Sequence, residues 1–256
     1  MLKTSLSIIV PAYNEEARIG DSLRRILNYI DEKIPSAELI VVDDGSTDAT
    51  VEVAEKVHTE FPHVQTKVFG YDKNRGKGYA VRLGLIKANG EIALFSDADL
   101  STPITELEKL VAPIENEKID VTFGSRALDR SLIGMHQPWQ REQGGRLINL
   151  MIRKMTGLPF SDTQCGFKAF RMSKFRSLLD TMTINRFGFD VEFLFVAKHR
   201  GLKLKEIPVR WNNVEGSKVS ALRDTRRMFN ELRQIRKNAK RGVYDKQSKL
   251  VENRRN

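Results

Sequence analysis

The chain has 256 residues, of which 40% are hydrophobic and 30% are charged, and its formal net charge is +10 at pH 7. This size allows one large domain with a substantial core, and no apolar run approaches the ~18 residues of a membrane-spanning helix, so we expect a soluble or peripheral protein. The single cysteine, Cys165, excludes an internal disulfide and a cysteine-based metal cage, and the four histidines lack the spacing of zinc ligands.

The first half of the chain alternates predicted strands with predicted helices. We expect strands over residues 5–10, 38–42, 66–69 and 92–95, and helices over residues 15–30, from the turn at 43–48 to about 58, and over 78–88. This order predicts an α/β domain with a Rossmann-like, mostly parallel sheet flanked by helices and with ligands at the carboxyl ends of the strands. The first apolar run is too short for a signal peptide, so we expect a cytoplasmic location.

Polar residues follow these strands. Asp43 and Asp44 follow the second strand, where one carboxylate could accept an N–H group from a uracil or guanine base, or both could only cap the next helix. Residues 74–80 read Asn-Arg-Gly-Lys-Gly-Tyr-Ala. This glycine-rich, basic loop could bring its backbone and Lys77 close to a nucleotide, or it could be an ordinary turn.

Two aspartates separated by one residue, Asp97 and Asp99, follow the strand over residues 92–95. We expect both to emerge at the sheet edge that binds ligands. Carboxylate oxygens suit Mg²⁺ or Mn²⁺, which takes its other ligands from water and from a substrate diphosphate. The alternative is a solvated strand end whose aspartates make Asx turns or cap the following helix.

Four motifs in this order resemble the inverting family 2 glycosyltransferases of the GT-A fold. They are Ile-Val-Pro-Ala-Tyr-Asn-Glu-Glu at 9–16, Val-Val-Asp-Asp-Gly-Ser-Thr-Asp at 41–48, Asn-Arg-Gly-Lys-Gly at 74–78 and Asp-Ala-Asp at 97–99. Motifs of the second half are similar to the dolichyl-phosphate β-glucosyltransferase and polyprenyl-phosphate glycosyltransferase branch. They lie at residues 123–126, 162–168, 188–192, 211 and 215–218, so the resemblance extends to about residue 222.

The resemblance implies a site for a nucleotide-sugar donor. It implies that Asp97 and Asp99 hold the ribose and the metal on the diphosphate, and we count both among the catalytic residues. Lys218 lies on a glycine-containing loop that could close over the diphosphate, although a solvated lysine is the alternative. The residues assigned to the donor are Pro11, Tyr13, Glu15, Asp43, Asp44, Lys77, Asp97 and Lys218.

Three arginines are candidates for the acceptor site. Arg126 follows a predicted short strand over residues 121–124, and Arg141 and Arg146 flank a glycine pair before an apolar segment. Because arginine binds phosphate in a bidentate manner, one or two of these side chains could hold an acceptor phosphate, or each could be a surface charge.

Asp190 is the third candidate catalytic residue. A phosphate acceptor is largely ionised at pH 7 and needs little help from a base, whereas a sugar hydroxyl would need Asp190 as a general base. Alternatively, Asp190 and Glu192 only favour the N-terminal dipole of the helix over residues 191–199. We assign Cys165 no catalytic role, because no local histidine could activate it.

The positive charge is concentrated near the C-terminus. Residues 217–256 hold 13 of the 43 Lys and Arg residues but 4 of the 33 Asp and Glu residues, so the rest of the chain is nearly neutral. Residues 221–241 combine apolar spacings of three, four and seven with many arginines, which predicts a basic amphipathic helix. This helix could lie on an anionic membrane or pack on the body, and we expect residues 244–256 to be frayed.

We therefore expect a GT-A domain over residues 1–220 and a basic C-terminal helical extension over residues 221–256. The predicted activity is metal-dependent, inverting transfer of a hexose, preferably from UDP-glucose, to a polyprenyl or dolichyl phosphate at a membrane surface. The alternatives are GDP-mannose as donor, a saccharide hydroxyl as acceptor, or a nucleic-acid-binding protein on a degenerate transferase body. Retention of both aspartates disfavours the last. A membrane partner protein or a homo-oligomer stays open.

Overall fold

The computed structural model describes residues 4–135, 139–214 and 221–246 of the chain. The described residues form a seven-stranded sheet of order β3-β2-β1-β4-β7-β5-β8 and a two-stranded sheet of β6 (Ile133–Met135) and β9 (Trp211–Asn212). The large sheet consists of β1 (Leu6–Ala12), β2 (Glu38–Asp43), β3 (Gln65–Gly70), β4 (Ile92–Ser96), β5 (Val121–Ser125), β7 (Phe167–Arg171) and β8 (Leu204–Pro208).

The sheet is mostly parallel. β1 pairs in parallel with β2 and β4, while β7 runs antiparallel between β4 and β5. In β1, Ile8 and Val10 point into one hydrophobic core and Ile9 points into the other, so both faces of the sheet are covered. The predicted α/β fold class is therefore confirmed.

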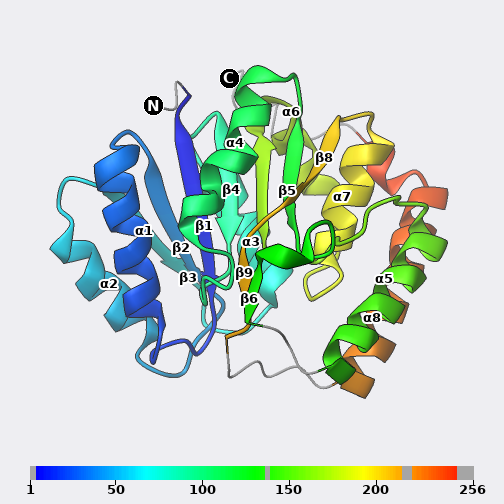
Figure 1. Ribbon diagram of the computed structural model, residues 1–256, viewed down its shortest axis with the longest axis horizontal. Helices are drawn as coiled ribbons and strands as arrows, with labels where there is room; N and C mark the ends of the chain where they lie inside the picture. Colours follow the sequence, from blue (N-terminus) through cyan, green and yellow to red (C-terminus); the bar gives the residue numbers. More distant parts are fainter. Residues whose placement is uncertain (1–3, 136–138, 215–220, 247–256) are drawn as a thin grey trace.

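Helices form a layer on each face of the sheet (Figure 1). The first layer consists of α1 (Ile19–Lys33), α2 (Thr50–Glu60) and α4 (Leu107–Asn116). The second layer consists of α3 (Lys77–Lys87), α5 (Trp139–Thr156), α6 (Met172–Phe175), α7 (Phe189–His199) and α8 (Ala221–Lys240). The connections after β1, β2 and β4 meet at one edge of the sheet, because these three neighbouring strands are parallel.

The first predicted helix starts later in the structure than expected. The first helix begins at Ile19 rather than at Glu15, because residues 15–18 form a turn in which the Glu15 carbonyl accepts the N–H groups of Arg18 and Ile19. The glycine pair Gly144 and Gly145 lies inside α5 and does not interrupt the helix.

The predicted C-terminal helix is present as α8, and it packs on the body. Met228, Leu232 and Ile235 are buried in the second core, together with Tyr244 of the short 3₁₀ turn Val243–Asp245. The expectation that fraying begins at residue 244 is therefore wrong for Tyr244, because its ring packs into this core. The apolar stripe of α8 therefore faces the protein and leaves its arginines and lysines at the surface, beside α5 (Figure 1). Among the helices of the described residues, none has the length and apolar character needed to cross a membrane.

Candidate active site

Asp97 and Asp99 lie directly after β4 at the carboxyl edge of the sheet, and both side chains are partly exposed. The Lys77 ammonium group, at the start of α3, lies 2.5 Å from Asp97 Oδ1. Burial opposes the charge of Lys77, but the carboxylates of Asp97, Asp190 and, more weakly, Asp99 outweigh it and raise the pKa of Lys77. The Asp97 carboxylate and the Lys77 ammonium group of the glycine-rich loop thus lie side by side in the structure.

Asp99 also makes the Asx turn that was the alternative interpretation. Its Oδ1 accepts the N–H group of Ser101 at 2.9 Å, and Leu100 between them has a positive φ of 47°. Such a turn uses one carboxylate oxygen of Asp99 and so is compatible with a ligand on the other.

Gly166, which precedes β7, fixes the position of Asp97. Its carbonyl accepts the Asp97 N–H group at 3.1 Å, and a Cβ atom at residue 166 would lie 2.2 Å from Asp97 Oδ2. Residue 166 does not have a positive φ. Glycine is therefore required here by close packing against the carboxylate, not by a positive φ.

A buried ion pair lies behind the aspartates. The Lys168 ammonium group on β7 is fully buried and donates to Asp190 Oδ1 at the start of α7 and to the Cys165 carbonyl. Burial raises the pKa of Asp190, and the nearby ammonium groups of Lys168 and Lys77 limit that rise. Asp190 therefore shares one electrostatic cluster with Asp97, but it already has a cationic partner.

Asp44 organises the loop that carries Lys77. Its carboxylate is buried and accepts hydrogen bonds from Tyr71, Asn74 and the N–H groups of Arg75 and Gly76. The predicted contact of Asp44 with a base would therefore add to bonds that the loop already makes. Gly76 has a φ of 104°, a conformation that favours glycine.

The other predicted donor residues lie around the ends of β1 and β2. Pro11 lies within β1, Tyr13 follows it and is 42% exposed, and Glu15 binds the Arg18 guanidinium. Asp43 Oδ2 accepts the N–H groups of Gly45 and Ser46, whereas its buried Oδ1 has no hydrogen-bond partner among the described residues. Lys218 lies outside the described residues.

The three predicted acceptor arginines have different environments. Arg126 makes a bidentate pair with Asp162, with Nε–Oδ2 and Nη2–Oδ1 distances of 2.6 and 2.9 Å, and its guanidinium lies 5.6 Å from the Trp211 ring centre. Burial opposes the charge of Arg126, but Asp162 and, more weakly, Asp97 raise its pKa. Arg146 is exposed on α5. The side chain of Arg141 lies outside the described part of the structure.

Four residues of the site were not predicted as donor, acceptor, catalytic or metal residues: Arg18, Asp162, Gly166 and Lys168. A lysine between Phe167 and Ala169 in strand β7 was the detectable signal for Lys168, because an ammonium group is buried only with a partner. The Glu15 carboxylate and, more weakly, that of Asp99 raise the pKa of Arg18. Cys165 is buried, and burial raises the pKa of its thiol to about 11, so the expectation that it is not a nucleophile agrees with its environment.

The described residues contain no cluster of three or more His, Cys, Asp or Glu side chains that could form a complete metal cage. Asp97 and Asp99 offer two carboxylates. Such a pair suits Mg²⁺, which commonly binds one or two protein carboxylates together with substrate phosphates and water.

Comparisons with known proteins all point to one family of glycosyltransferases. The model of the family "Glycosyl transferase family 2" matches residues 7–179. Dolichyl-phosphate beta-glucosyltransferase of Drosophila melanogaster is 35% identical over 226 residues, which cover 84% of this chain and 69% of that protein. The Saccharomyces cerevisiae protein of the same name is 32% identical over 260 residues, covering 93% and 76%.

A solved structure also has a similar fold. Glucosyl-3-phosphoglycerate synthase from Mycobacterium tuberculosis, in complex with Mn²⁺, UDP and glucosyl-3-phosphoglycerate, gives a TM-score of 0.67 at 21% identity. The similarity covers 91% of this chain and 78% of that one. At this identity the comparison supports the GT-A fold of the chain.

Proposed function

The chain belongs to glycosyl transferase family 2, and from this premise we propose that it transfers glucose from UDP-glucose to a polyprenyl or dolichyl phosphate with inversion at C1. The resemblance drawn from the motifs is confirmed, and the chain is a glycosyltransferase. The observation that supports the proposal most is the meeting of Asp97, Asp99 and Lys77 at the carboxyl edge of the sheet.

The donor would lie across the ends of β1, β2 and β4. Tyr13 and the loop held by Asp44 would border the nucleoside, while Lys77 would face the diphosphate. Pro11, Glu15 and Asp43 surround the same strand ends. An ammonium group beside two carboxylates can interact with the negative charge that develops on the leaving nucleotide.

A divalent cation fits this pair of aspartates. Asp97 Oδ1 pairs with the Lys77 ammonium group at 2.5 Å, and a carboxylate oxygen has two lone pairs, so one pair contact leaves coordination capacity on this carboxylate. We propose that Asp97 and Asp99 hold Mg²⁺ or Mn²⁺, which when bound would stabilise the charge of the departing diphosphate.

The state of Asp190 favours a phosphate acceptor. In a single in-line displacement, an acceptor oxygen forms the new bond to C1 as the bond from C1 to the diphosphate oxygen breaks. A phosphate oxygen is already ionised at neutral pH, whereas a sugar hydroxyl must lose its proton to a base. Because Lys168 already binds Asp190 inside the protein, we assign Asp190 to electrostatic positioning rather than to proton removal.

The acceptor side would be formed by Arg126, with Arg146, which is exposed on α5, and Arg141 as the further candidates. Asp162 binds two of the Arg126 nitrogens and thereby fixes the direction of the guanidinium plane. A guanidinium oriented in this way can bind a phosphate through its remaining N–H groups.

We propose that α5 and α8 bring the enzyme to an anionic membrane. The side chains of Leu147 and Leu150 on α5 are 69% and 48% exposed, and their spacing places them on one side of the helix. The exposed basic residues on the two helices include Arg146, Arg153, Lys154, Arg226, Arg233, Arg236, Lys237 and Lys240. Each basic residue near an anionic surface contributes about 1 kcal/mol. Peripheral binding at the cytoplasmic face fits this arrangement.

The test is transfer from UDP-glucose, UDP-galactose and GDP-mannose to a short polyprenyl phosphate or a saccharide, with Mn²⁺, followed by mass spectrometry. We expect a glucosyl polyprenyl phosphate from UDP-glucose, and Asp99→Asn should reduce its formation by about 100-fold or more. Asp21→Asn, an exposed aspartate on α1, serves as the matched control. Transfer only to the saccharide would contradict the proposal. So would an activity of Asp99→Asn without metal that equals the activity of the wild type with Mn²⁺.

A further inference from the structure

The segment over residues 182–189 connects two parts of the candidate site. It lies against the loop that carries Lys77, because the Asn185 carbonyl accepts the Tyr79 N–H group at 3.2 Å. The Arg82 guanidinium of α3 donates to the Met182 carbonyl and to Asn185 Oδ1, both at 2.8 Å. The segment then leads directly into α7 and Asp190.

The contact with the Lys77 loop is tight. A Cβ atom at Gly76 would lie 2.4 Å from the Asn185 carbonyl oxygen, and one at Gly78 would lie 2.4 Å from the Phe189 Cβ atom. Lys77 is therefore enclosed between two points at which the loop touches this segment. Because packed interiors are dense, a displacement of the segment would move Lys77 and Asp190 together.

Two glutamates hold this segment. Glu192 is fully buried and accepts the N–H groups of Thr183 and Ile184 as well as the Tyr244 hydroxyl. Glu231, which comes from α8, accepts the N–H group of Gly188 at 2.7 Å. Gly188 is the N-cap residue of α7. Because glycine has no side chain, Gly188 cannot cap the helix itself.

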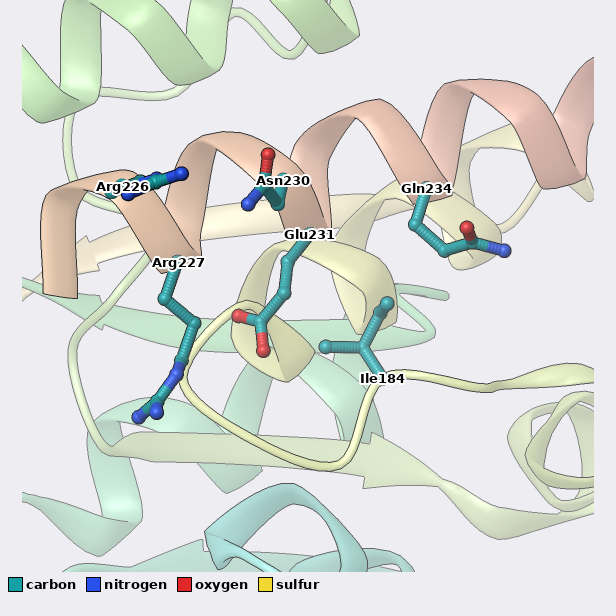
Figure 2. Close-up of a pocket in the computed structure, with 6 residues that line it drawn as sticks. All are labelled: Ile184, Arg226, Arg227, Asn230, Glu231 and Gln234. Atoms are coloured by element: carbon teal, nitrogen blue, oxygen red, sulfur yellow. The ribbon is translucent and has the colours of Figure 1, made fainter. Parts of the chain in front are cut away.

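Glu231 is close enough to exclude any larger residue at position 188. A Cβ atom there would lie 2.8 Å from Glu231 Oε2 and 2.9 Å from its Cβ atom, although Gly188 has an ordinary φ of −74°. Figure 2 shows Glu231 extending from α8 toward the loop before α7, next to a hollow bordered by Ile184 and Arg227. The carboxylate thus lies where α8 meets the active-site segment.

We propose that Glu231 is a positioning residue: by holding the Gly188 amide it keeps Asp190 and the Lys77 loop in the arrangement needed for glycosyl transfer. This inference rests on the proposed function. It makes α8 a structural part of the active site as well as a surface helix. A displacement of about 1 Å in a catalytic group can reduce the rate by about 100-fold, so loss of one such hydrogen bond can affect turnover without unfolding the protein.

The experiment compares Glu231→Ala, Glu231→Gln and Asn230→Ala, the last being an exposed neighbour on the same helix. Glu231→Ala should lower kcat at least about tenfold at a temperature well below its melting temperature. Glu231→Gln should stay within about threefold of the wild type, because its amide oxygen can still accept the Gly188 N–H group. Asn230→Ala should match the wild type.

Hydrogen–deuterium exchange provides a readout that does not depend on activity. The peptide covering residues 183–189 should exchange faster in Glu231→Ala than in the wild type, and Glu231→Gln should restore the slow exchange. A wild-type kcat or unchanged exchange in Glu231→Ala overturns the inference, as does an equal defect in Glu231→Gln. If the wild type transfers no sugar, the proposed function fails, and the exchange comparison alone decides the role of Glu231.

Discussion

Gly166 and Asp97 illustrate how single residues define the site. The Gly166 backbone lies so close to the Asp97 carboxylate that a methyl group has no room, while Lys77 lies on another side of that carboxylate. Lys168 and Asp190 form a second charged pair deeper in the protein. The position of each carboxylate is thus set by a neighbour from a distant part of the chain.

Gly166→Ala should displace Asp97 and strongly impair transfer. A Cβ atom would lie 2.2 to 2.3 Å from the three terminal atoms of the Asp97 side chain, so the carboxylate must move. We expect kcat to fall about tenfold or more and the Mn²⁺ concentration needed for half-maximal activity to rise. Gly144→Ala is the control, because nothing lies within 4 Å of its Cβ position on α5. Wild-type metal dependence in Gly166→Ala would refute this packing argument.

The Arg126–Asp162 pair should make stability depend on pH in acid. Burial disfavours the charged form of Asp162. The positive charge and the hydrogen bonds of Arg126 outweigh this effect and lower the pKa of Asp162. The unfolded chain therefore takes up this proton first, at a pKa of about 3.9. The stability contributed by the pair is complete above that pH and is lost as the pH falls through the folded-state pKa.

Urea unfolding of the wild type and Asp162→Asn between pH 7 and pH 3 measures this effect. At pH 7 we expect Asp162→Asn to lower the free energy of unfolding by about 3 kcal/mol, because it leaves Arg126 without its partner. The difference between the two proteins should shrink below about pH 4. A difference that stays constant over the whole range would show that the charge of Asp162 does not matter.

At the scale of elements, α8 has two sides in different environments. Its apolar side completes the second core, and Glu231 reaches the segment before α7. Its basic side is exposed beside α5. Deletion of residues 221–256 would therefore uncover the core as well as remove charge, and so it cannot measure membrane binding alone.

Reversing the charge of exposed residues on α8 tests membrane binding without changing the apolar side of the helix. Changing Arg233, Arg236 and Lys237 to Glu should reduce sedimentation with anionic vesicles about tenfold or more, because each reversal replaces attraction by repulsion. The melting temperature should change by only a few degrees, since these side chains are exposed. A matched control reverses Arg25, Lys33 and Lys56 on α1 and α2, in the opposite helix layer. Equal loss in both triple variants would argue against a docking surface on α8.

At the scale of the whole molecule, the parallel order of β2, β1 and β4 brings the predicted donor residues together. Residues 44, 77 and 97 lie far apart in the chain, yet they meet because parallel strands present their carboxyl ends at one edge. The antiparallel strand β7 then adds Gly166 and Lys168 from the second half of the chain. A nucleotide bound there would contact both halves and stabilise the whole domain.

Thermal unfolding should report this binding. UDP with Mn²⁺ at about 100 times its dissociation constant should add about 2.7 kcal/mol, which corresponds to a rise in melting temperature of about 5 to 10 °C. Chelation of the metal by EDTA should remove most of the rise, and the Asp99→Asn variant should show little of it. A larger shift with GDP than with UDP would identify a guanosine donor instead.

The amino-acid sequence by itself determined the fold class and the family, and it supplied the motifs from which the donor-side residues were predicted. Strand and helix periodicity is a local property, and motifs such as Asp97-Ala98-Asp99 lie within a few residues. The α8 helix was also predictable from its apolar spacing. What periodicity cannot give is the partner that an apolar stripe packs against, and here it is the body of the protein.

Only the tertiary structure decided how charges and close contacts are paired. Four contacts show this: Lys168 with Asp190, Arg126 with Asp162, Gly166 against Asp97 and Glu231 on Gly188. They join residues that are up to 69 positions apart in the chain. Such pairs depend on which strands become neighbours and on the space left between them, and both are set by the packing of the whole sheet and its helices. That is the physical reason why the roles of these residues were not readable from local sequence.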